Sequence, residues 1–308
     1  MEQVYEIKDC KSFEPKDIFD CGQCFRWNVC EDGSYTGIFG RNVLNVKKSD
    51  KKVVISGVCD GGIEEICRHY FDLDRDYETI KDTLSKIDEN LAQSIKYGAG
   101  IRLLNQDLWE TIISFITSAN NNIPRIKGIL NRISEKYGDK IEFRGKVYYT
   151  FPTAEKLGKA SVGELREIGL GFRDKYIFDT TKMINDKVID LEELTKEKDT
   201  KKIRNKLLTL QGVGPKVADC ILLFSTLKRL DVFPIDVWVR RVMNELYIHE
   251  PDEAKVSKKQ IEKIAKDTFG DLEGIAQQYL FYYRRSAWAY KLFMVEVAVE
   301  KQVTYLMI

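Results

Sequence analysis

A lysine and an aspartate in the last third of the chain could together support nucleophilic chemistry. Lys216 follows a short turn in LQGVGPK, and Asp236 lies twenty residues later, within VFPIDVW. At the mouth of a pocket a lysine amine can act as a nucleophile, and a carboxylate facing a cleft can stabilise positive charge. Both residues also have a structural interpretation, with Lys216 a solvated charge on a helical hairpin and Asp236 the N-cap of the next helix. The two residues alone leave both interpretations open.

The turn before Lys216 has the composition of a tight connection between two helices. Gly212 and Gly214 accept backbone angles that other residues avoid, and Pro215 suits the first position of the helix that follows. Such a turn leaves N–H groups unpaired at a helix N-terminus, which favours phosphate binding. Lys216 lies four residues before Cys220, so the two share neighbouring surface at the edge of the buried face of that helix.

The elements that must position these residues change in character near residue 100. Before it, β-forming segments separated by Gly, Asn and Asp turns predict strands at 34–40, 41–48 and 51–57. After it, apolar residues recur with a helical period, and Asp107 with Glu110 has the pattern of a capping box. The predicted helices cover DLWETIISFITSANNN, IPRIKGILNRISEKYG, 154–168, 174–186, 200–209, 215–227, 237–247, 258–268 and 273–300.

These patterns predict an α+β protein. We expect a strand-rich N-terminal lobe with an antiparallel sheet, residues 1–100, followed by an all-helical body, residues 101–308, with the helical hairpin at 203–227. No internal repeat or low-complexity linker separates the two.

Composition narrows the class of protein. The chain has 308 residues, of which 44% are apolar and 31% charged, a balance typical of globular proteins. No run of about 18 uncharged apolar residues occurs and the start lacks signal-peptide features, so we expect a cytoplasmic protein with no membrane contact. The net charge is −5 over residues 1–100, +1 over 101–200 and +5 over 201–308, so a polyanion would dock on the C-terminal two-thirds.

The cysteines indicate reduced thiols. There are seven, an odd number, and six of them precede residue 70, which does not suit a disulfide framework. The C-x-x-C at 21–24 has no second cysteine pair at matching spacing, which argues against a metal site there. The Lys- and Ile-rich composition favours a bacterial source.

The segment from the turn to Asp236 resembles the helix-hairpin-helix DNA glycosylases, which have a Gly/Pro-rich loop followed by an aspartate. The resemblance implies that Lys216 is a Schiff-base nucleophile and that Asp236 stabilises the positive charge that develops as the base departs. Amine attack requires the neutral form, so we expect the pocket to lower the pKa of Lys216, a shift that a nearby Asp236 would oppose.

The same resemblance assigns the turn to DNA. It implies that the hairpin grips a phosphate through Gly212, Val213 and Gly214. By analogy, the backbone carbonyl groups of Leu208, Leu210 and Val213 could coordinate a monovalent cation, Na⁺ or K⁺. No other cofactor is expected.

Further motifs resemble the 8-oxoguanine DNA glycosylase branch of this superfamily. GQCFRW resembles a segment in which the carbonyl of the first glycine, here Gly22, accepts the N7–H that only the oxidised purine carries. SANNNIPR resembles the segment that fills the gap in the duplex, which implies that Asn120 and Arg125 read the orphaned cytosine. These stretches could otherwise be a C-x-x-C loop and a polar helix end.

Two other segments complete the resemblance. GLGFR could be a simple helix ending, but in the family pattern Phe172 is a wedge beside the estranged base and Arg173 a second contact to cytosine. In GIAQQYLFYY, otherwise an amphipathic helix, the pattern implies that Gln277 meets the Watson–Crick edge of the flipped base. Phe281 would stack on one face of that base and Cys220 on the other.

One residue departs from the pattern. Trp238 stands where many relatives have His, which leaves the phosphate contact or pocket wall at that position in doubt. The resemblance nevertheless runs from about residue 20 to residue 285, with its motifs in family order.

We therefore expect a monomeric bifunctional glycosylase/lyase that excises 8-oxoguanine opposite cytosine from damaged duplex DNA and nicks the strand by β-elimination. One alternative is a relative of endonuclease III acting on oxidised pyrimidines; Cys220 is the only cysteine after residue 67, which excludes the four-cysteine iron–sulfur cluster of many such enzymes. The other alternative, a non-catalytic duplex-binding module, would leave Lys216, Asp236 and Gln277 unexplained.

Overall fold

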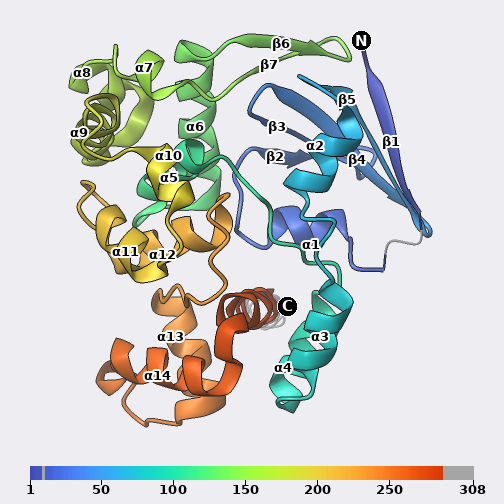
Figure 1. Ribbon diagram of the computed structural model, residues 1–308, viewed down its shortest axis with the longest axis vertical. Helices are drawn as coiled ribbons and strands as arrows, with labels where there is room; N and C mark the ends of the chain where they lie inside the picture. Colours follow the sequence, from blue (N-terminus) through green and yellow to red (C-terminus); the bar gives the residue numbers. More distant parts are fainter. Residues whose placement is uncertain (9–10, 287–308) are drawn as a thin grey trace, which may run out of the picture.

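An antiparallel sheet forms the N-terminal part of the molecule. The structure, a computed structural model, describes residues 1–8 and 11–286. The five strands pair antiparallel in the order β1-β5-β4-β3-β2 (Figure 1). They are β1 (Gln3–Lys8), β2 (Trp27–Val29), β3 (Tyr35–Phe39), β4 (Asn42–Ser49) and β5 (Lys52–Val58). The strands predicted at 34–40, 41–48 and 51–57 are confirmed as β3, β4 and β5.

The sheet buries one face under two helices, α1 (Pro15–Asp20) and α2 (Ile63–Tyr70). Phe19 of α1 stacks on Trp27 of β2 at 3.9 Å between ring centres, and Trp27 donates its indole N–H to the Tyr70 hydroxyl at 2.9 Å. Because these aromatic contacts fix both ends of the 21–26 loop, the loop between α1 and β2 has a defined position on the lobe.

The first hundred residues contain more helix than their sequence predicts. After α2 the chain forms α3 (Tyr77–Ser85) and α4 (Glu89–Tyr97). Asp76 and Asp88 cap these two helices by accepting backbone N–H groups at their N-termini. These acceptors satisfy N–H groups that would otherwise be unpaired, which favours helix here in a segment that we expected to be mainly strand.

The rest of the described chain is mostly helical. Figure 1 shows α6 standing between the sheet and α7–α9, with α11–α14 further along the molecule. The helices are α5 (Leu108–Ser118), α6 (Ile123–Tyr137), α7 (Ala154–Leu157), α8 (Val162–Leu165), α9 (Arg173–Asn185), α10 (Leu191–Lys196), α11 (Thr200–Leu207), α12 (Pro215–Phe224), α13 (Val237–Met243) and α14 (Lys258–Phe269), with short helical turns η1 (Arg166–Leu170), η2 (Asn244–Ile248), η3 (Glu253–Lys255) and η4 (Gly270–Leu272). The α+β class and the order of sheet and helices are confirmed.

We had expected an all-helical body, and this expectation is wrong. A hairpin of β6 (Lys140–Phe143) and β7 (Lys146–Tyr149) follows α6. Phe143 packs against Ile38 and Val43 on the face of the large sheet opposite α1 and α2. The hairpin therefore exists because it covers that second face, a demand that local sequence does not reveal.

A last helix runs over residues 273–286 and packs into the core of the body through Tyr279 and Leu280. The helix predicted at 273–300 is confirmed to residue 286, and the remainder of it lies outside the described residues. No helix in the described part of the chain is long and apolar enough to cross a membrane.

Candidate active site

The turn between α11 and α12 is as tight as its glycines suggest, but the two glycines differ. Gly212 has a φ of +79°, and a Cβ there would lie 2.8 Å from the Tyr176 ring, so only glycine fits. Gly214 has an ordinary φ of −88°, and no atom lies within 4 Å of where its Cβ would be. The expectation of an unusual backbone angle is wrong for Gly214. Its lack of a side chain instead leaves the N-terminus of α12 open.

Lys216 lies in the first turn of α12, directed toward an aromatic ring of α5. Its ammonium nitrogen is 5.4 Å from the centre of the Phe115 ring. Burial lowers the pKa of Lys216, but Cys220 and the Asp236 carboxylate raise it, and the net pKa lies above the usual 10.5. Our expectation that the pocket lowers this pKa is therefore wrong for the free protein. Lys216 is an ammonium ion at neutral pH and must lose a proton before it can attack.

Cys220 lies one turn after Lys216 on the buried side of α12. Its side chain is 3% exposed, and burial raises the pKa of the thiol to about 11. Cys220 is therefore a neutral, polarizable group at physiological pH rather than a second nucleophile.

Asp236 is both a helix N-cap and a carboxylate that faces a cavity, the two interpretations that the sequence left open. Its carboxylate accepts the backbone N–H of Val239 at 2.8 Å and so caps α13. The same side chain lines a cavity with Lys216 and raises the pKa of that lysine. A cap on a short helix thus places a carboxylate beside the amine.

This cavity, of about 50 Å³, joins segments far apart in the sequence. The two residues predicted to be catalytic and the four predicted to hold a base all line it: Lys216, Asp236, Gly22, Cys220, Gln277 and Phe281. They come from the 21–26 loop, the hairpin, the start of α13 and the helix 273–286. The structure therefore brings these six residues together.

Two hydrogen-bond acceptors in the cavity wall lack donors. Gln277 is 5% exposed, and its Oε1 is buried with no hydrogen-bond partner among the described residues. The Gly22 carbonyl likewise accepts no hydrogen bond within the described part of the chain. Leaving the buried Gln277 oxygen unpaired costs about 1–3 kcal/mol, so the free protein maintains an unfavourable arrangement there that a ligand with N–H donors would satisfy.

Gly22 is also required for its backbone conformation. Its φ is +92°, and a Cβ there would lie 3.2 Å from Arg285 Nη1 and 3.6 Å from the Phe281 ring. Any side chain at this position would be strained and would crowd the cavity, since Phe281 lines it.

Arg125, in the first turn of α6, touches the turn that leads to Phe172. Phe172 is 57% exposed and meets Tyr176 edge-on, with 6.1 Å between ring centres. Arg125 is exposed and donates to the Gly169 carbonyl at 3.3 Å. Since Tyr176 also packs against Gly212, these loops and the hairpin turn form one continuous face.

Arg173 and Asn120 lie in the same region but differ in exposure. Arg173 is 2% exposed and donates to the carbonyl groups of Asn120, at 2.8 Å, and of Ala119. Asn120 is exposed, with a left-handed φ of +50°. In the free protein Arg173 therefore supports the loop that presents Asn120.

Trp238, at the start of α13, is 41% exposed, and the Arg241 guanidinium lies 5.3 Å from its ring centre. It is two residues after Asp236, which lines the cavity, but Trp238 itself does not line it. The adjoining Val237 is 58% exposed. Adjoining apolar groups this exposed are typical of a surface that meets a partner.

The carbonyl groups suggested for a monovalent cation all belong to the hairpin turn. The Leu210 carbonyl accepts the N–H of Val213 at 3.2 Å, which leaves its second lone pair available. Val213 is 6% exposed and Leu210 is 3% exposed, so the turn is anchored in the core and Leu208 packs beside it. These features fit a cation, and the site stays a prediction.

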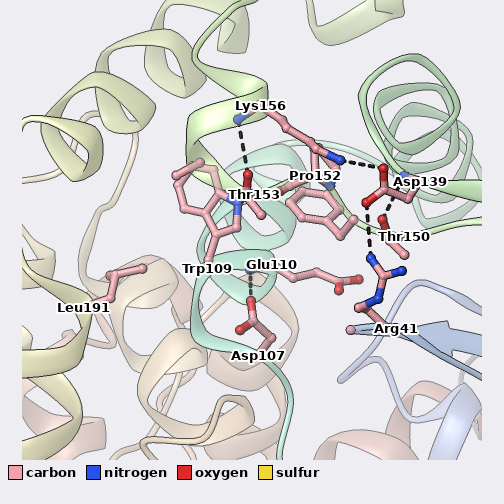
Figure 2. Close-up of a pocket in the computed structure, with 13 residues that line it drawn as sticks. Arg41, Asp107, Trp109, Glu110, Asp139, Thr150, Pro152, Thr153, Lys156 and Leu191 are labelled. Atoms are coloured by element: carbon pink, nitrogen blue, oxygen red, sulfur yellow. Dashed lines mark hydrogen bonds and ion pairs between the residues drawn. The ribbon is translucent and has the colours of Figure 1, made fainter. Parts of the chain in front are cut away.

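A second cavity, of about 410 Å³, lies near the N-terminal end of α5 (Figure 2). Asp107 accepts the N–H of Glu110 at 2.8 Å, but Glu110 turns away from the helix end to pair with Arg26 at 3.4 Å. Only half of the predicted capping box therefore forms. Burial raises the pKa of Glu110 to about 7 although Arg26 opposes the shift. Because Arg26 follows the Gly22 segment, this ion pair ties the segment to α5.

Sequence reasoning missed residues that the structure adds to the small cavity. Phe115 reads as one of many core residues of α5, yet its ring lies beneath the Lys216 ammonium. Gln278, adjacent to Gln277, also lines the cavity. Nothing in the local pattern distinguishes these residues from their neighbours, because their importance comes from tertiary contacts.

Comparison with known proteins agrees with the fold and the hairpin. Residues 113–267 match the HhH-GPD superfamily of base excision DNA repair proteins, which defines the class. Residues 7–112 match the N-terminal domain of 8-oxoguanine DNA glycosylase. The chain belongs to the 8-oxoguanine DNA glycosylase family of N-glycosylase/DNA lyases within this superfamily.

Two relatives illustrate the similarity. The 8-oxoguanine glycosylase/lyase of Clostridium acetobutylicum, in its apo form, is 44% identical with a TM-score of 0.85 over 92% of this chain and 98% of that one. The same protein has been solved with double-stranded DNA containing cytosine opposite 8-oxoguanine, at 45% identity, a TM-score of 0.85 and the same coverage. An N-glycosylase/DNA lyase of Saccharomyces cerevisiae is 32% identical over 255 residues, 75% of this chain and 67% of its own.

Proposed function

We propose that this protein excises 8-oxoguanine opposite cytosine from duplex DNA through a Schiff base on Lys216 and then nicks the strand. The observation that carries the proposal is the small cavity. It combines a lysine, a carboxylate, an unpaired amide oxygen and a free glycine carbonyl on facing walls. Amine, charge stabiliser and base-reading groups are the parts that such a reaction needs.

Binding of damaged duplex DNA is supported by the surface around the cavity. The open N-terminus of α12 offers backbone N–H groups for a phosphate, and residues 201–308 carry a net charge of +5. The Clostridium relative was solved with a duplex containing the lesion base. We propose that the protein binds DNA as a monomer, with Trp238 against the backbone near Asp236.

The base must be flipped out of the helix to reach Lys216. A cavity of about 50 Å³ is far below the roughly 300 Å³ typical of a site for a small molecule, so we propose that the walls move apart on binding. Phe281 and Cys220 then stack on the two faces of the base. Gln277 accepts an N–H from its Watson–Crick edge, and the Gly22 carbonyl accepts the N7–H of 8-oxoguanine.

Discrimination against guanine follows from that carbonyl. Unmodified guanine has a lone pair at N7, which the Gly22 oxygen would repel where 8-oxoguanine offers a donor. In a water-poor site, one hydrogen bond exchanged for a repulsion changes affinity by orders of magnitude.

The chemistry begins with Lys216 as an ammonium ion. The nitrogen must lose a proton, attack C1′ and displace the base, which leaves with the electron pair of the glycosidic bond and takes up a proton. Asp236 stabilises the positive charge that develops on the sugar. The covalent product rearranges to a Schiff base, loss of a C2′ proton expels the 3′ phosphate, and water releases Lys216.

The opposite strand would be read by the loops at 119–125 and 169–173. We propose that Phe172 occupies the space of the flipped base, while Asn120 and Arg125 contact the orphaned cytosine. Arg173 would reach cytosine only by exchanging a carbonyl partner, so its first role is to shape the Asn120 loop. A Na⁺ or K⁺ ion at Leu208, Leu210 and Val213 would stiffen the hairpin turn.

The proposed site draws on both predicted lobes. Residues 1–100 supply Gly22, and residues 101–308 supply every other site residue. We propose that the enzyme acts on the nucleoid in the bacterial cytoplasm. These assignments rest on composition and on the relatives.

A borohydride-trapping and cleavage assay tests the function. One duplex carries 8-oxoguanine opposite cytosine, and its control carries guanine. We expect a covalent adduct and a nick on the first duplex alone, loss of the adduct in Lys216→Gln, and its retention in Lys86→Gln, which changes an exposed lysine directly after α3. An adduct that survives in Lys216→Gln contradicts the role of that lysine. Activity only on oxidised pyrimidines would show that the substrate is an oxidised pyrimidine instead of 8-oxoguanine. Binding of DNA without cleavage would favour the alternative of a non-catalytic DNA-binding module.

A further inference from the structure

The helix 273–286 presents two neighbouring stripes with different contacts. Gln277 and Phe281, four residues apart, line the cavity. Gln278, Tyr282 and Arg285 have i, i+4, i+7 spacing and form the adjacent stripe. This second stripe contacts the N-terminal lobe around Gly22.

Each residue of the second stripe makes a hydrogen bond to α1 or to the turn that follows it. Gln278, 2% exposed, donates its amide N–H to the Cys21 carbonyl at 2.8 Å. The Tyr282 hydroxyl donates to Asp17 Oδ1 at 3.2 Å, and the Arg285 guanidinium donates to the Asp20 carbonyl. The three bonds connect parts of the chain separated by more than 250 residues.

One of these bonds acts directly on the peptide unit before Gly22, and a second residue of the stripe lies beside the glycine. The Cys21 carbonyl is part of the Cys21–Gly22 peptide unit, so its bond to Gln278 fixes the plane of that unit. Arg285 lies beside Gly22, because its Nη1 is 3.2 Å from the position that a Cβ on Gly22 would occupy. Its Cζ is also 5.3 Å from the Phe281 ring centre. Arg285 thus touches both the glycine and the aromatic ring.

The far side of the glycine is held by its neighbour Gln23. The Gln23 side chain accepts the Leu104 N–H and donates to the Arg102 carbonyl, each at 2.8 Å. The residues on both sides of Gly22 are therefore held by hydrogen bonds, and Arg285 lies beside the glycine. The Gly22 carbonyl itself remains available as an acceptor.

We propose that Gln278, Tyr282 and Arg285 are positioning residues that set the distance between the Gly22 carbonyl and the Gln277–Phe281 stripe. This proposal rests on the proposed function, in which Gly22 reads N7–H and Gln277 reads the opposite edge of one base. The two readers belong to different lobes, so the spacing between them decides whether both bonds can form at once. A shift of a few tenths of an ångström is enough to weaken such paired recognition.

The test compares two reactions of one enzyme. Excision of 8-oxoguanine requires the base to be read, whereas nicking of a duplex with a preformed abasic site uses Lys216 with no base to read. For Arg285→Ala and Tyr282→Phe we expect single-turnover excision to fall by about tenfold, with abasic-site nicking within about twofold of wild type. Gln278→Leu should lower excision by a similar factor, but it is not used in the comparison with nicking because Gln278 also lines the cavity. Arg285→Lys, which keeps a donor for the Asp20 carbonyl, should restore part of the loss.

Arg284→Ala is the matched control. Its guanidinium points to the other side of the helix, pairing with Glu245 of η2 at 3.3 Å, so both reactions should remain near wild type. In a Lys216→Gln background, the ratio of binding affinities for the 8-oxoguanine duplex over the guanine duplex should also fall about tenfold when Arg285→Ala is added. The same ratio should stay unchanged when Arg284→Ala is added.

Three results would overturn the proposal. A parallel loss of excision and nicking in the stripe variants would mean that these contacts support only the fold. Unchanged excision in all three variants would mean that they position nothing. A wild-type enzyme that neither excises 8-oxoguanine nor nicks abasic DNA would remove the proposed function itself, whereas an active wild type with indifferent variants removes only this inference.

Discussion

Replacing Gln277 should make the protein more stable and less active. Its buried Oε1 has no partner among the described residues, in a side chain that is 5% exposed. Methionine has a similar volume and shape but no polar atom, so Gln277→Met removes the unpaired acceptor without leaving a cavity.

The two effects have estimable sizes. The unpaired acceptor costs the wild-type protein about 1–3 kcal/mol, so its removal should increase stability by up to that amount. The imperfect fit of methionine offsets part of this increase. We expect the free energy of unfolding to rise by about 1 kcal/mol, which corresponds to a Tm increase of roughly 2 °C for a chain of this length. In the complex the same substitution loses a hydrogen bond to the base, worth about 1.5–3 kcal/mol in a dry site, so excision should slow by about 10- to 100-fold.

Denaturant unfolding and single-turnover excision of 8-oxoguanine measure the two effects on the same preparations. Gln260→Met, at an exposed position of α14, is the control and should change neither. A Gln277→Met protein that is destabilised and still excises the base at the wild-type rate would refute the reasoning, because the oxygen would then have a structural partner and no ligand.

Three further outcomes are expected. Asp236→Asn keeps an N-cap for α13 but removes the charge, so excision should slow about a hundredfold or more with little change in Tm; an unchanged rate would leave Asp236 only a cap. Arg125→Ala should relax the preference for cytosine, and equal rate ratios across the four opposing bases before and after the change would contradict that role. Burial raises the pKa of Glu110 from 4.5 to about 7, so its folded state binds a proton more tightly and stability is lost as pH rises through that interval. The stability of Glu110→Gln relative to wild type should therefore increase by about 3 kcal/mol between pH 4.5 and pH 8, and a flat difference in urea unfolding would exclude this shift.

Local sequence patterns were enough to predict the elements that are determined by local interactions. The strands β3, β4 and β5, the hairpin α11–α12 and the caps at Asp107 and Asp236 all follow from alternation, glycine placement or an acceptor at a helix start. By contrast, β6 and β7 form because they cover a sheet face contributed by residues about 100 positions earlier. No window around residues 140–149 contains that information.

The candidate site shows the same division. Family motifs named Gly22, Lys216, Asp236 and Gln277, and the cavity contains all four. The charge state of Lys216 could not be read from the sequence, because the balance between burial and Asp236 depends on tertiary distances. The contact between Gln278 and Cys21 was invisible for the same reason.

Several locally unfavourable features gather on one face of the molecule. The unpaired Gln277 oxygen, the left-handed Asn120, the exposed Phe172 and the exposed Trp238 each reduce stability or solubility. Gln277 lines the cavity with Lys216, Phe172 meets Tyr176, which packs against the hairpin turn, and Arg173 supports the Asn120 loop. A chain selected only for stability would replace them one by one, and a single ligand is the simplest common explanation that we propose for them. The proposed complex with a duplex and one flipped nucleotide would satisfy them together: the base would supply donors to Gln277, Phe172 would enter the vacated stack, and the orphaned partner would lie against Asn120.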